Sequence, residues 1–226
     1  MTALRARFDT VDVENVTRVF GATRALAGVT LTFRAGEVAC LEGPNGAGKS
    51  TLLGMLATLA KPTSGELRWG DYRMPEDRAS IRASIGWVAH ESMVYPDLTP
   101  REALALLGSL HDLADAAARV EAAIARAGLQ ALADRPARTF SRGQLQRLAM
   151  ARAELHAPSM LLFDEPTTGL DAASVARLEG DLAAARDRGC IVVLVTHDAG
   201  FAKAVSDVRI GLERGRVASV TRATAA

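Results

Sequence analysis

Long apolar runs are missing from this 226-residue chain, and so is the usual mark of secretion. The longest candidates, such as Ile191–Val195, have the length of a strand and fall far short of the roughly 20 residues of a membrane-spanning helix. The first residues contain no apolar signal segment. The only two cysteines, Cys40 and Cys190, each lie in an apolar run that predicts a buried strand. We therefore expect no membrane insertion, no disulfide or cysteine metal site, and a reducing cytoplasmic location.

An excess of charge of one sign is also missing. The chain has 27 basic and 26 acidic residues, a formal net charge of +1, and its arginines are scattered through predicted helices. We therefore expect no nucleic acid among its partners. Lysine is scarce, with only Lys49, Lys61 and Lys203, so a lysine at a motif position is less easily explained by chance. An apolar content of 49% can form a sizeable core, and only Met1–Arg7 and Thr221–Ala226 are expected to fray.

The order of predicted elements is that of an α/β protein. Strands at Val29–Phe33 and Glu37–Leu41 precede a glycine-rich turn, and a helix begins at Lys49. The apolar face of that helix is predicted to consist of Leu52, Leu53, Leu56 and Leu59. A turn at residues 61–65 separates it from a strand at Glu66–Trp69.

The middle of the chain changes character. Residues 90–155 are rich in alanine and leucine at helical spacing, and Thr99, Pro100 and Glu102 form a typical helix start. Apolar strands at Met160–Phe163 and Ile191–Val195 follow, joined by a helix, which is the alternation of a parallel sheet. We predict a two-lobed α/β fold whose core comes from both ends of the chain.

The glycine-rich turn is a phosphate-binding motif. Gly43-Pro44-Asn45-Gly46-Ala47-Gly48-Lys49-Ser50 matches G-x-x-x-x-G-K-[ST] and lies between a predicted strand and a predicted helix, as the motif requires. Its backbone N–H groups can bind phosphate oxygens, Lys49 can reach the β- and γ-phosphates, and the Ser50 hydroxyl can ligate Mg²⁺. Thr51 completes the predicted ATP site. The alternative, an ordinary glycine-rich turn, is disfavoured by the flanking elements.

A pair of acids follows the strand at Met160–Phe163. Asp164 and Glu165 stand at its carboxyl end, the edge at which open α/β sheets bind ligands. Asp164 is a candidate for holding Mg²⁺, and Glu165 for orienting or deprotonating the water that attacks the γ-phosphate. The alternative is a solvated pair of loop residues.

These residues resemble the ATP-binding subunits of ABC transporters over nearly the whole chain. Phe140-Ser141-Arg142-Gly143-Gln144 is similar to the family signature Leu-Ser-Gly-Gly-Gln, with Arg142 in place of the first glycine. The resemblance implies that Ser141, Gly143 and Gln144 contact ATP held by a second subunit. It thus implies a homodimer or a heterodimer of such subunits, and an integral membrane permease as partner. Ser141 is also suited to cap the helix that carries Leu145 and Leu148. Arg142 either strengthens ATP-driven dimerisation or points outward without effect.

The resemblance also implies a fold and further site residues. It implies one domain over 1–226, with a P-loop NTPase (RecA-like) core at 1–89 and 156–220, an antiparallel β edge and a helical subdomain at 90–155. Phe20 stands where the family stacks an aromatic ring on adenine. Asp171 lies in the dimer-contacting loop and is a good cap for the next helix. His197 matches the histidine that contacts the γ-phosphate and holds the attacking water.

The most informative departure is His90, where most ABC ATPases carry a glutamine near Mg²⁺ and the water. We expect His90 to keep that coupling role, since its ring can hydrogen-bond or ligate metal. His90, the segment Tyr95–Thr99 and the Phe-Ser-Arg-Gly-Gln signature resemble the haem-export branch of cytochrome c maturation. His111 and His156 match no motif and are expected at surface helix positions.

The sequence thus predicts an ATPase that hydrolyses ATP, with Lys49, Glu165 and His197 as its catalytic residues, on the inner face of the cell membrane. Two alternatives share the site. One is a soluble ABC-type ATPase of an assembly scaffold such as iron–sulfur cluster building. The other, a DNA-repair or chromosome-associated ATPase, is set aside because such proteins insert long coiled coils between their core halves.

Overall fold

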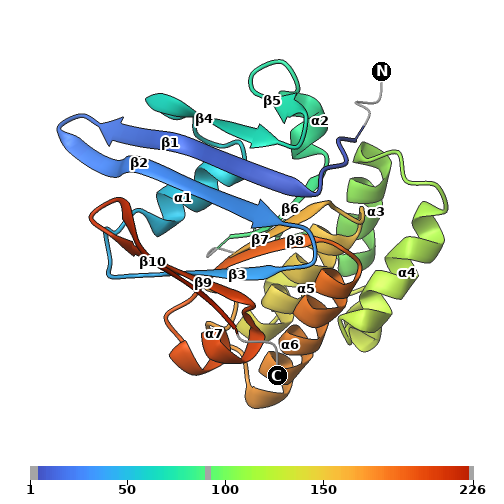
Figure 1. Cartoon of the computed structure of the whole chain (residues 1–226). Helices are drawn as coiled ribbons and strands as arrows, with labels where there is room; N and C mark the ends of the chain where they lie inside the picture. The colour runs from blue at the N-terminus through green and yellow to red at the C-terminus, as the bar shows by residue number, and fades with distance from the viewer. Residues whose placement is uncertain (1–4, 90–92, 224–226) are drawn as a thin grey trace.

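Two β-sheets lie on either side of one helix in the computed structural model, which describes residues 5–89 and 93–223 (Figure 1). The first sheet is antiparallel, in the order β2-β1-β4-β5. Its strands are β1 (Thr10–Phe20), β2 (Thr23–Arg34), β4 (Ser64–Trp69) and β5 (Tyr72–Arg73). The second sheet has the order β10-β9-β3-β8-β7-β6, and all its neighbouring strands are parallel except β10 on β9. Its strands are β3 (Val38–Glu42), β6 (Ile85–Val88), β7 (Met160–Asp164), β8 (Ile191–Val195), β9 (Val208–Glu213) and β10 (Arg216–Arg222). The mainly parallel sheet and the antiparallel β edge are confirmed.

The central strands are apolar throughout because both of their faces are covered. In β8, Ile191, Val193 and Val195 pack in the core between the two sheets. Val192 and Leu194 point the other way, into a core shared with α5 (Arg142–Glu154), α6 (Ala172–Asp187) and α7 (Ala199–Val205). This alternation is the normal pattern of a parallel strand buried on both faces.

Helix α1 (Lys49–Leu56) packs between the sheets and is shorter than the sequence predicted. Leu52, Leu53 and Leu56 are fully buried, but Leu59 is 58% exposed. The helix ends early because Thr58 takes a left-handed conformation (φ 60°), and the Leu59 N–H then donates to the Gly54 carbonyl. The predicted place of Leu59 on the buried face is therefore wrong.

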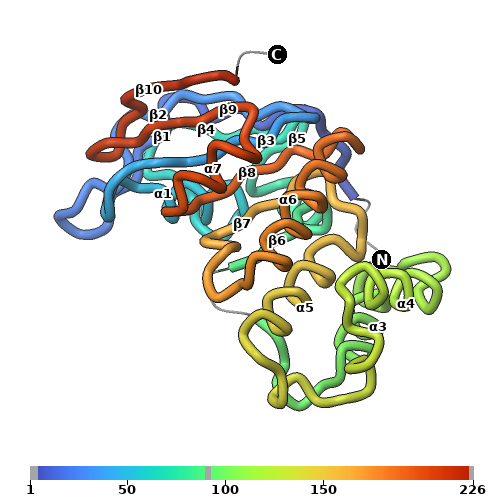
Figure 2. Tube along the Cα trace, turned by 90° about the horizontal axis from the view of Figure 1, so that it is seen from below, coloured from blue at the N-terminus to red at the C-terminus, as the bar shows by residue number. Residues whose placement is uncertain are grey.

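A separate helical group lies to one side of the sheets (Figure 2). Helix α3 (Pro100–Leu110) begins with the predicted cap, since the Thr99 hydroxyl accepts from the Glu102 N–H and the Glu102 carboxylate accepts from the Thr99 N–H. Helices α3, α4 (Ala116–Arg126) and one face of α5 form a third apolar core. The remaining short elements are α2 (Arg78–Arg82) and the 3₁₀ turns η1 (Gln130–Leu132) and η2 (Ala137–Thr139).

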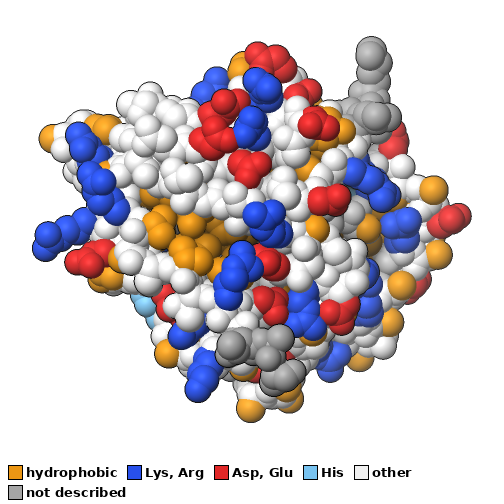
Figure 3. All heavy atoms as spheres, in the orientation of Figure 1, with side chains coloured by type: hydrophobic (Ala, Val, Ile, Leu, Met, Phe, Trp, Pro, Cys, Tyr) orange, Lys and Arg blue, Asp and Glu red, His pale blue; other side chains and the backbone are white. Residues whose placement is uncertain are grey.

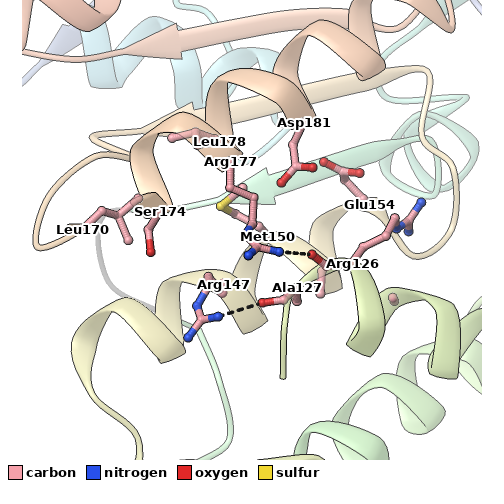
Figure 4. A pocket seen from close by; sticks show the side chains of 12 residues that line it. Arg126, Ala127, Arg147, Met150, Glu154, Leu170, Ser174, Arg177, Leu178 and Asp181 are labelled. Carbon is pink, nitrogen blue, oxygen red and sulfur yellow. Dashed lines mark hydrogen bonds between the residues drawn. The ribbon is translucent and has the colours of Figure 1, made fainter. Parts of the chain in front are cut away.

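Two arginines from different helices bind the C-terminal end of α4 (Figure 4). Arg147 of α5 donates to the carbonyls of Ala127 and Gly128, and Arg177 of α6 donates to the carbonyl of Arg126. All three acceptors lie at the C-terminal end of α4, where a helix leaves carbonyl groups unsatisfied. The position of α4 is therefore set from both α5 and α6.

Two sequence predictions about peripheral residues are wrong. Ala6 is 1% exposed and its N–H donates to the Ser80 carbonyl, while β10 continues through Arg222, so parts of the predicted frayed ends are packed. His156 is 3% exposed rather than on the surface, and its ring stacks on that of half-buried His111 with centroids 4.2 Å apart. Burial lowers the pKa of His156 to about 3, helped by the charges of His111 and Arg5.

The surface carries charges of both signs. On the face in Figure 3, basic and acidic side chains are interspersed, and hydrophobic side chains are visible in a hollow between them. None of the helices in the described ranges is long and apolar enough to cross a bilayer.

Candidate nucleotide site

Three neighbouring parallel strands bring the predicted motifs to one edge of the six-stranded sheet. The glycine-rich turn follows β3, Asp164 and Glu165 stand at the end of β7, and His197 follows β8. Together they border an open cavity of about 430 Å³. Its lining consists of Thr23, Arg24, Ala25, Asn45, Gly46, Gly48, Lys49, Ser50, Thr51, Asp164, Glu165, Val195 and His197. The cavity lies at the carboxyl ends of the strands, the usual ligand edge of such sheets.

Glycines in the turn are required by both conformation and space. Gly43, Gly46 and Gly48 have φ values of 138°, 80° and 103°, which side chains strongly disfavour. A Cβ on Gly43 would lie 2.2 Å from the Leu212 carbonyl oxygen, and one on Gly48 would lie 2.5 Å from that of Ala25. Gly46 has open space around it, which leaves its backbone accessible to a ligand.

Positive charge lies at the base of the cavity. Lys49 is 6% exposed, and its ammonium group donates to the carbonyls of Gly43 (2.7 Å) and Pro44 (3.1 Å). Lys49 also begins helix α1, whose N-cap, Gly48, supplies no side-chain cap and whose first turn contains no acid. The first N–H groups and the positive end of the helix are therefore available to a phosphate.

Glu165 is held in an unusual backbone conformation beside His197. Its φ is 53°, its N–H donates to the Val195 carbonyl (2.8 Å), and its Oε2 accepts from the His197 N–H (3.1 Å). The other oxygen, Oε1, is buried and forms no hydrogen bond within residues 5–89 and 93–223, although His197 Nε2 lies 3.4 Å away. A left-handed glutamate costs about 1–2 kcal/mol, and such strain is concentrated at functional sites.

The signature segment begins helix α5. The Ser141 hydroxyl accepts from the Gln144 N–H (3.3 Å), and Gln144 Oε1 accepts from the Ser141 N–H (2.9 Å), a complete capping box that confirms the predicted cap. Asp171 caps α6 as predicted, because its carboxylate accepts from the Ser174 N–H (2.8 Å). The hydrogen bonds from Ser174 lower the pKa of Asp171.

Comparison with known protein families decides the classification. Residues 26–168, more than half of the chain, match the family model described as ABC transporter. This chain belongs to the ABC transporter family. It is an ABC ATPase, and the matched range includes the glycine-rich turn, Asp164 and Glu165.

Several characterised ABC proteins are similar to the chain over most of their length. The cytochrome c biogenesis ATP-binding export protein CcmA of Gluconobacter oxydans is 40% identical over 83% of this chain and 81% of its own. CcmA of Paramagnetospirillum magneticum is 43% identical over 83% and 88%. The glutamine transport ATP-binding protein GlnQ of Escherichia coli is 36% identical over 92% and 89%.

Solved ABC cassettes have the same fold. The dimeric structure of a bacterial ABC transporter cassette has a TM-score of 0.85 and 30% identity, over 96% of this chain and all of the other. A dimeric post-hydrolysis state of the same cassette, bound to ADP and Pi, has a TM-score of 0.86 at the same identity and coverage.

The structure adds residues that the motifs did not indicate. Thr23, Arg24 and Ala25 line the cavity from the start of β2, and Thr23 pairs with Phe20 across the β1–β2 hairpin. Phe20 itself is 49% exposed, outside the lining, and the Arg18 guanidinium lies 4.4 Å from its ring centroid. Only the short spacing from Phe20 in the sequence could have indicated Thr23.

A buried glutamine also connects helix α5, which begins at the signature segment, to the loop after β7. Gln146 of α5 is 8% exposed, and its Nε2 donates to the Pro166 carbonyl (3.2 Å), next to Glu165. No motif indicated this contact, because Gln146 lies on the buried side of helix α5.

Arg142, the departure from the ABC signature, lies against its own chain. A Cβ on Gly169 would meet Arg142 Cδ at 2.6 Å and Nε at 3.0 Å, so the arginine side chain lies over Gly169 in the loop that leads to Asp171. The side chain is exposed, but it is directed along this loop rather than away from the protein.

The predicted site residues thus fall into two groups. The first group surrounds one cavity and consists of residues 43–51, Asp164, Glu165 and His197. Three members of the turn, Gly43, Pro44 and Ala47, lie directly beside the lining rather than in it. Ser141, Gly143, Gln144 and Asp171 do not line it. His90 lies outside the described residues.

Proposed function

We propose that this chain hydrolyses ATP as one half of a dimeric ATPase that drives a separate membrane permease, in the cytochrome c maturation branch of the family. The observation that carries the proposal is the cavity, where Lys49, Glu165 and His197 meet beside an uncapped helix N-terminus. Two CcmA proteins at 40% and 43% identity support the branch.

The residues have complementary roles in this proposal. The backbone from Gly43 to Ser50 and the Lys49 ammonium bind the β- and γ-phosphates. Glu165 positions the attacking water and takes its proton. His197 lies 3.4 Å from Glu165, where it hydrogen-bonds the γ-phosphate and helps to hold that water. Phe20, at the rim of the cavity beside Thr23, is the adenine platform.

The chemistry of the donors fits a magnesium ion. Ser50 and Asp164 both line the cavity and offer the oxygen ligands that Mg²⁺ prefers. Oε1 of Glu165 is buried and accepts no hydrogen bond from the described residues, which leaves it available to a water or other donor beside them. A Mg²⁺ ion held by Ser50 and Asp164 would neutralise charge on the phosphates. His90 keeps its predicted coupling role at this site.

Dimerisation follows from the two groups of site residues. Ser141, Gly143, Gln144 and Asp171 lie outside the cavity of their own chain, so we assign them to the ATP of a second copy or of a related subunit. The similar solved cassette is a dimer, which supports this arrangement. The helix that Ser141 caps would present its N-terminus to the partner's γ-phosphate.

The catalytic assignment is tested by two variants and a control. Glu165→Gln keeps the shape of the side chain but removes the base, so ATP binding should persist while turnover falls by roughly 10² to 10⁴-fold. Lys49→Ala should weaken ATP binding itself. Glu76→Gln, at an exposed position, makes the same chemical change elsewhere and should have no effect. Turnover near wild type in Glu165→Gln would remove the base from the proposal.

A groove beside the sheet is the proposed permease-docking surface. It has a volume of about 340 Å³ and lies where α1 ends, next to β6, α3 and α5. Leu59 and Met93 line it and are 58% and 59% exposed, with Trp87 and Leu107 also in the lining. Exposed apolar side chains around a hollow are typical of a protein contact. An amphipathic segment of the permease would bind there, with its apolar side against Leu59 and Met93.

Purification from detergent-solubilised cells tests the partner. Tagged Glu165→Gln protein with ATP should co-purify with an integral membrane protein, identified by mass spectrometry, and its identity tests the cytochrome c branch against other cargoes. Leu59→Ser should reduce that recovery without changing ATP binding, whereas Val220→Ser, at an exposed apolar position on β10, should not. Recovery of soluble partners only would favour the assembly-scaffold ATPase.

The same proposal includes the organisation and location of the chain. We assign residues 1–89 and 156–220 to the RecA-like core and 90–155 to a helical subdomain, within one domain. Arg177 would then link the core to α4 of the helical subdomain. We place the protein on the cytoplasmic face of the membrane, held there by its permease.

A further inference from the structure

A second cavity lies at the opposite end of the strands that carry the catalytic residues. It is lined by Pro158 and Ser159, directly before β7, and by Gly189 and Cys190, directly before β8. The ATP cavity is reached at the other ends of the same two strands. A five-residue strand spans about 16 Å, so the two cavities are separate sites. The second one has a volume of about 430 Å³.

The lining of this cavity is strongly basic. Four arginines line it, Arg5, Arg7, Arg119 and Arg188, against a single acid, Asp9. Within the described residues, Arg7 and Arg119 form no ion pair, while Arg188 lies 3.6 Å from Glu154. The arginines also come from three distant parts of the chain: the segment before β1, helix α4, and the turn before β8. Such a concentration of one charge is unfavourable without a counter-ion.

Arg5 shows that the cluster is built into the fold. Its guanidinium donates to the carbonyls of His156 (2.6 Å) and His111 (2.8 Å), near the C-terminal ends of α5 and α3. These bonds hold the start of the chain against the helical group. Burial, and then the charges of Arg119 and Arg7, lower the pKa of Arg5, as expected where positive charges are brought together.

The inner wall contains buried polar side chains. Ser84 is 2% exposed and His156 is 3% exposed, and both line the cavity. The ring of His156 is within reach of the Ile85 backbone, but neither ring nitrogen makes a hydrogen bond of good geometry within the described residues. A buried imidazole held only by such a contact can gain a further hydrogen bond from a water or ligand in the cavity. His156 also lines the proposed permease groove, so it forms the wall between the two hollows.

We propose that this cavity binds a small anion of the diphosphate class, at a site distinct from the ATP site. Guanidinium groups bind phosphate oxygens in bidentate geometry. The four arginines outnumber Asp9 and the Glu154 that pairs with Arg188, which leaves two net positive charges for a diphosphate. The volume corresponds to more than ten waters of about 30 Å³ each, which is more than one phosphate group occupies. The anion could be free in solution or the headgroup of a lipid, and both present the same oxygens.

A titration followed by NMR separates this site from the P-loop. Inorganic pyrophosphate is added without Mg²⁺ to ¹⁵N-labelled protein, and the amides of Ala157 and Gly189, which line the cavity, are followed together with that of Gly46 in the P-loop. The expected result is a saturable shift of Ala157 and Gly189 with its own dissociation constant, about 1 mM or below.

Substitution of the exposed arginines provides the control. Arg7→Gln combined with Arg119→Gln should weaken binding at Ala157 and Gly189 by at least about tenfold, with no change at Gly46. Arg126→Gln, on the same helix as Arg119 but outside the cavity, should leave both sites unchanged.

A vesicle assay distinguishes the two sources. Co-sedimentation with vesicles that contain diacylglycerol pyrophosphate, lost only in the double variant and without a response to inorganic pyrophosphate, indicates a lipid headgroup. A response to pyrophosphate alone indicates a free anion. The proposal is overturned if neither probe binds, or if the double variant binds both as the wild type does.

Discussion

One methyl group added at three glycines in and beside the P-loop should have three different effects. Gly54 lies inside α1 with helical geometry and open space around its Cβ position. Gly54→Ala should therefore stabilise the protein by about 0.4–1 kcal/mol, through lower backbone entropy in the unfolded chain. Gly46 also has open space, but its φ of 80° should make Gly46→Ala destabilising by about 1–2 kcal/mol.

Gly48→Ala should be the most damaging substitution of the three. Its φ of 103° costs an alanine about 1–3 kcal/mol, and a Cβ there would lie 2.5 Å from the Ala25 carbonyl oxygen and 2.6 Å from Leu26 Cδ2. Overpacking of this kind adds about 1–3 kcal/mol, since one of the two contacts is with backbone that cannot rotate away. The expected total is about 2–6 kcal/mol.

Urea unfolding followed by circular dichroism measures the three free energies under one set of conditions, and binding of a fluorescent ATP analogue is measured beside it. Gly54→Ala should bind the analogue normally, while Gly48→Ala should bind poorly because its P-loop is displaced. If Gly48→Ala were no less stable than Gly46→Ala, the close approach of the P-loop to β2 would be refuted. A loss of stability in Gly54→Ala would contradict the helical assignment at that position.

Three further predictions concern caps, buried acids and thiols. Ser141→Ala removes the capping box of α5 and should cost about 0.5–2 kcal/mol of unfolding free energy, whereas Ser141→Thr should retain most of it; equal stability of the alanine and serine forms would contradict the cap. Burial raises the pKa of Asp181, and burial followed by the charge of Asp181 raises that of Glu154, whose side chain it faces in Figure 4. Because the folded state then holds more protons than the unfolded state between the ordinary and the raised pKa values, stability falls as pH rises through that window. Asp181→Asn should accordingly raise the melting temperature at pH 7 by roughly 2–4 °C, with a smaller gain near pH 4, and a uniform gain at both would exclude a titration effect. Burial raises the pKa of both Cys40 and Cys190 to about 12, so at pH 8 the folded protein should have about 10³-fold less thiolate than a free cysteine and should react with a thiol reagent only after unfolding in urea.

The sequence by itself determined the elements and the chemistry of the motifs. The P-loop was predictable because glycine spacing, a lysine and a hydroxyl are needed consecutively, and the chain supplies them between a strand and a helix. The caps at Thr99, Ser141 and Asp171 were predictable for the same reason, since a cap acts only on the three residues that follow it. Parallel pairing of β7 and β8 followed from their unbroken apolar composition.

Contacts between distant segments were decided only by the tertiary structure. The end of α1 before Leu59 depends on a left-handed Thr58, and apolar spacing carries no information about such a turn. The burial of His156 depends on the stacking of His111, 45 positions earlier, and on Arg5 at the start of the chain. Likewise, Thr23 and Gln146 reach the site because a hairpin and a helix face bring them there. Motifs and caps depend on consecutive residues and can therefore be predicted from the sequence. Cavities form where distant segments pack together, and no local sequence pattern indicates which segments will meet.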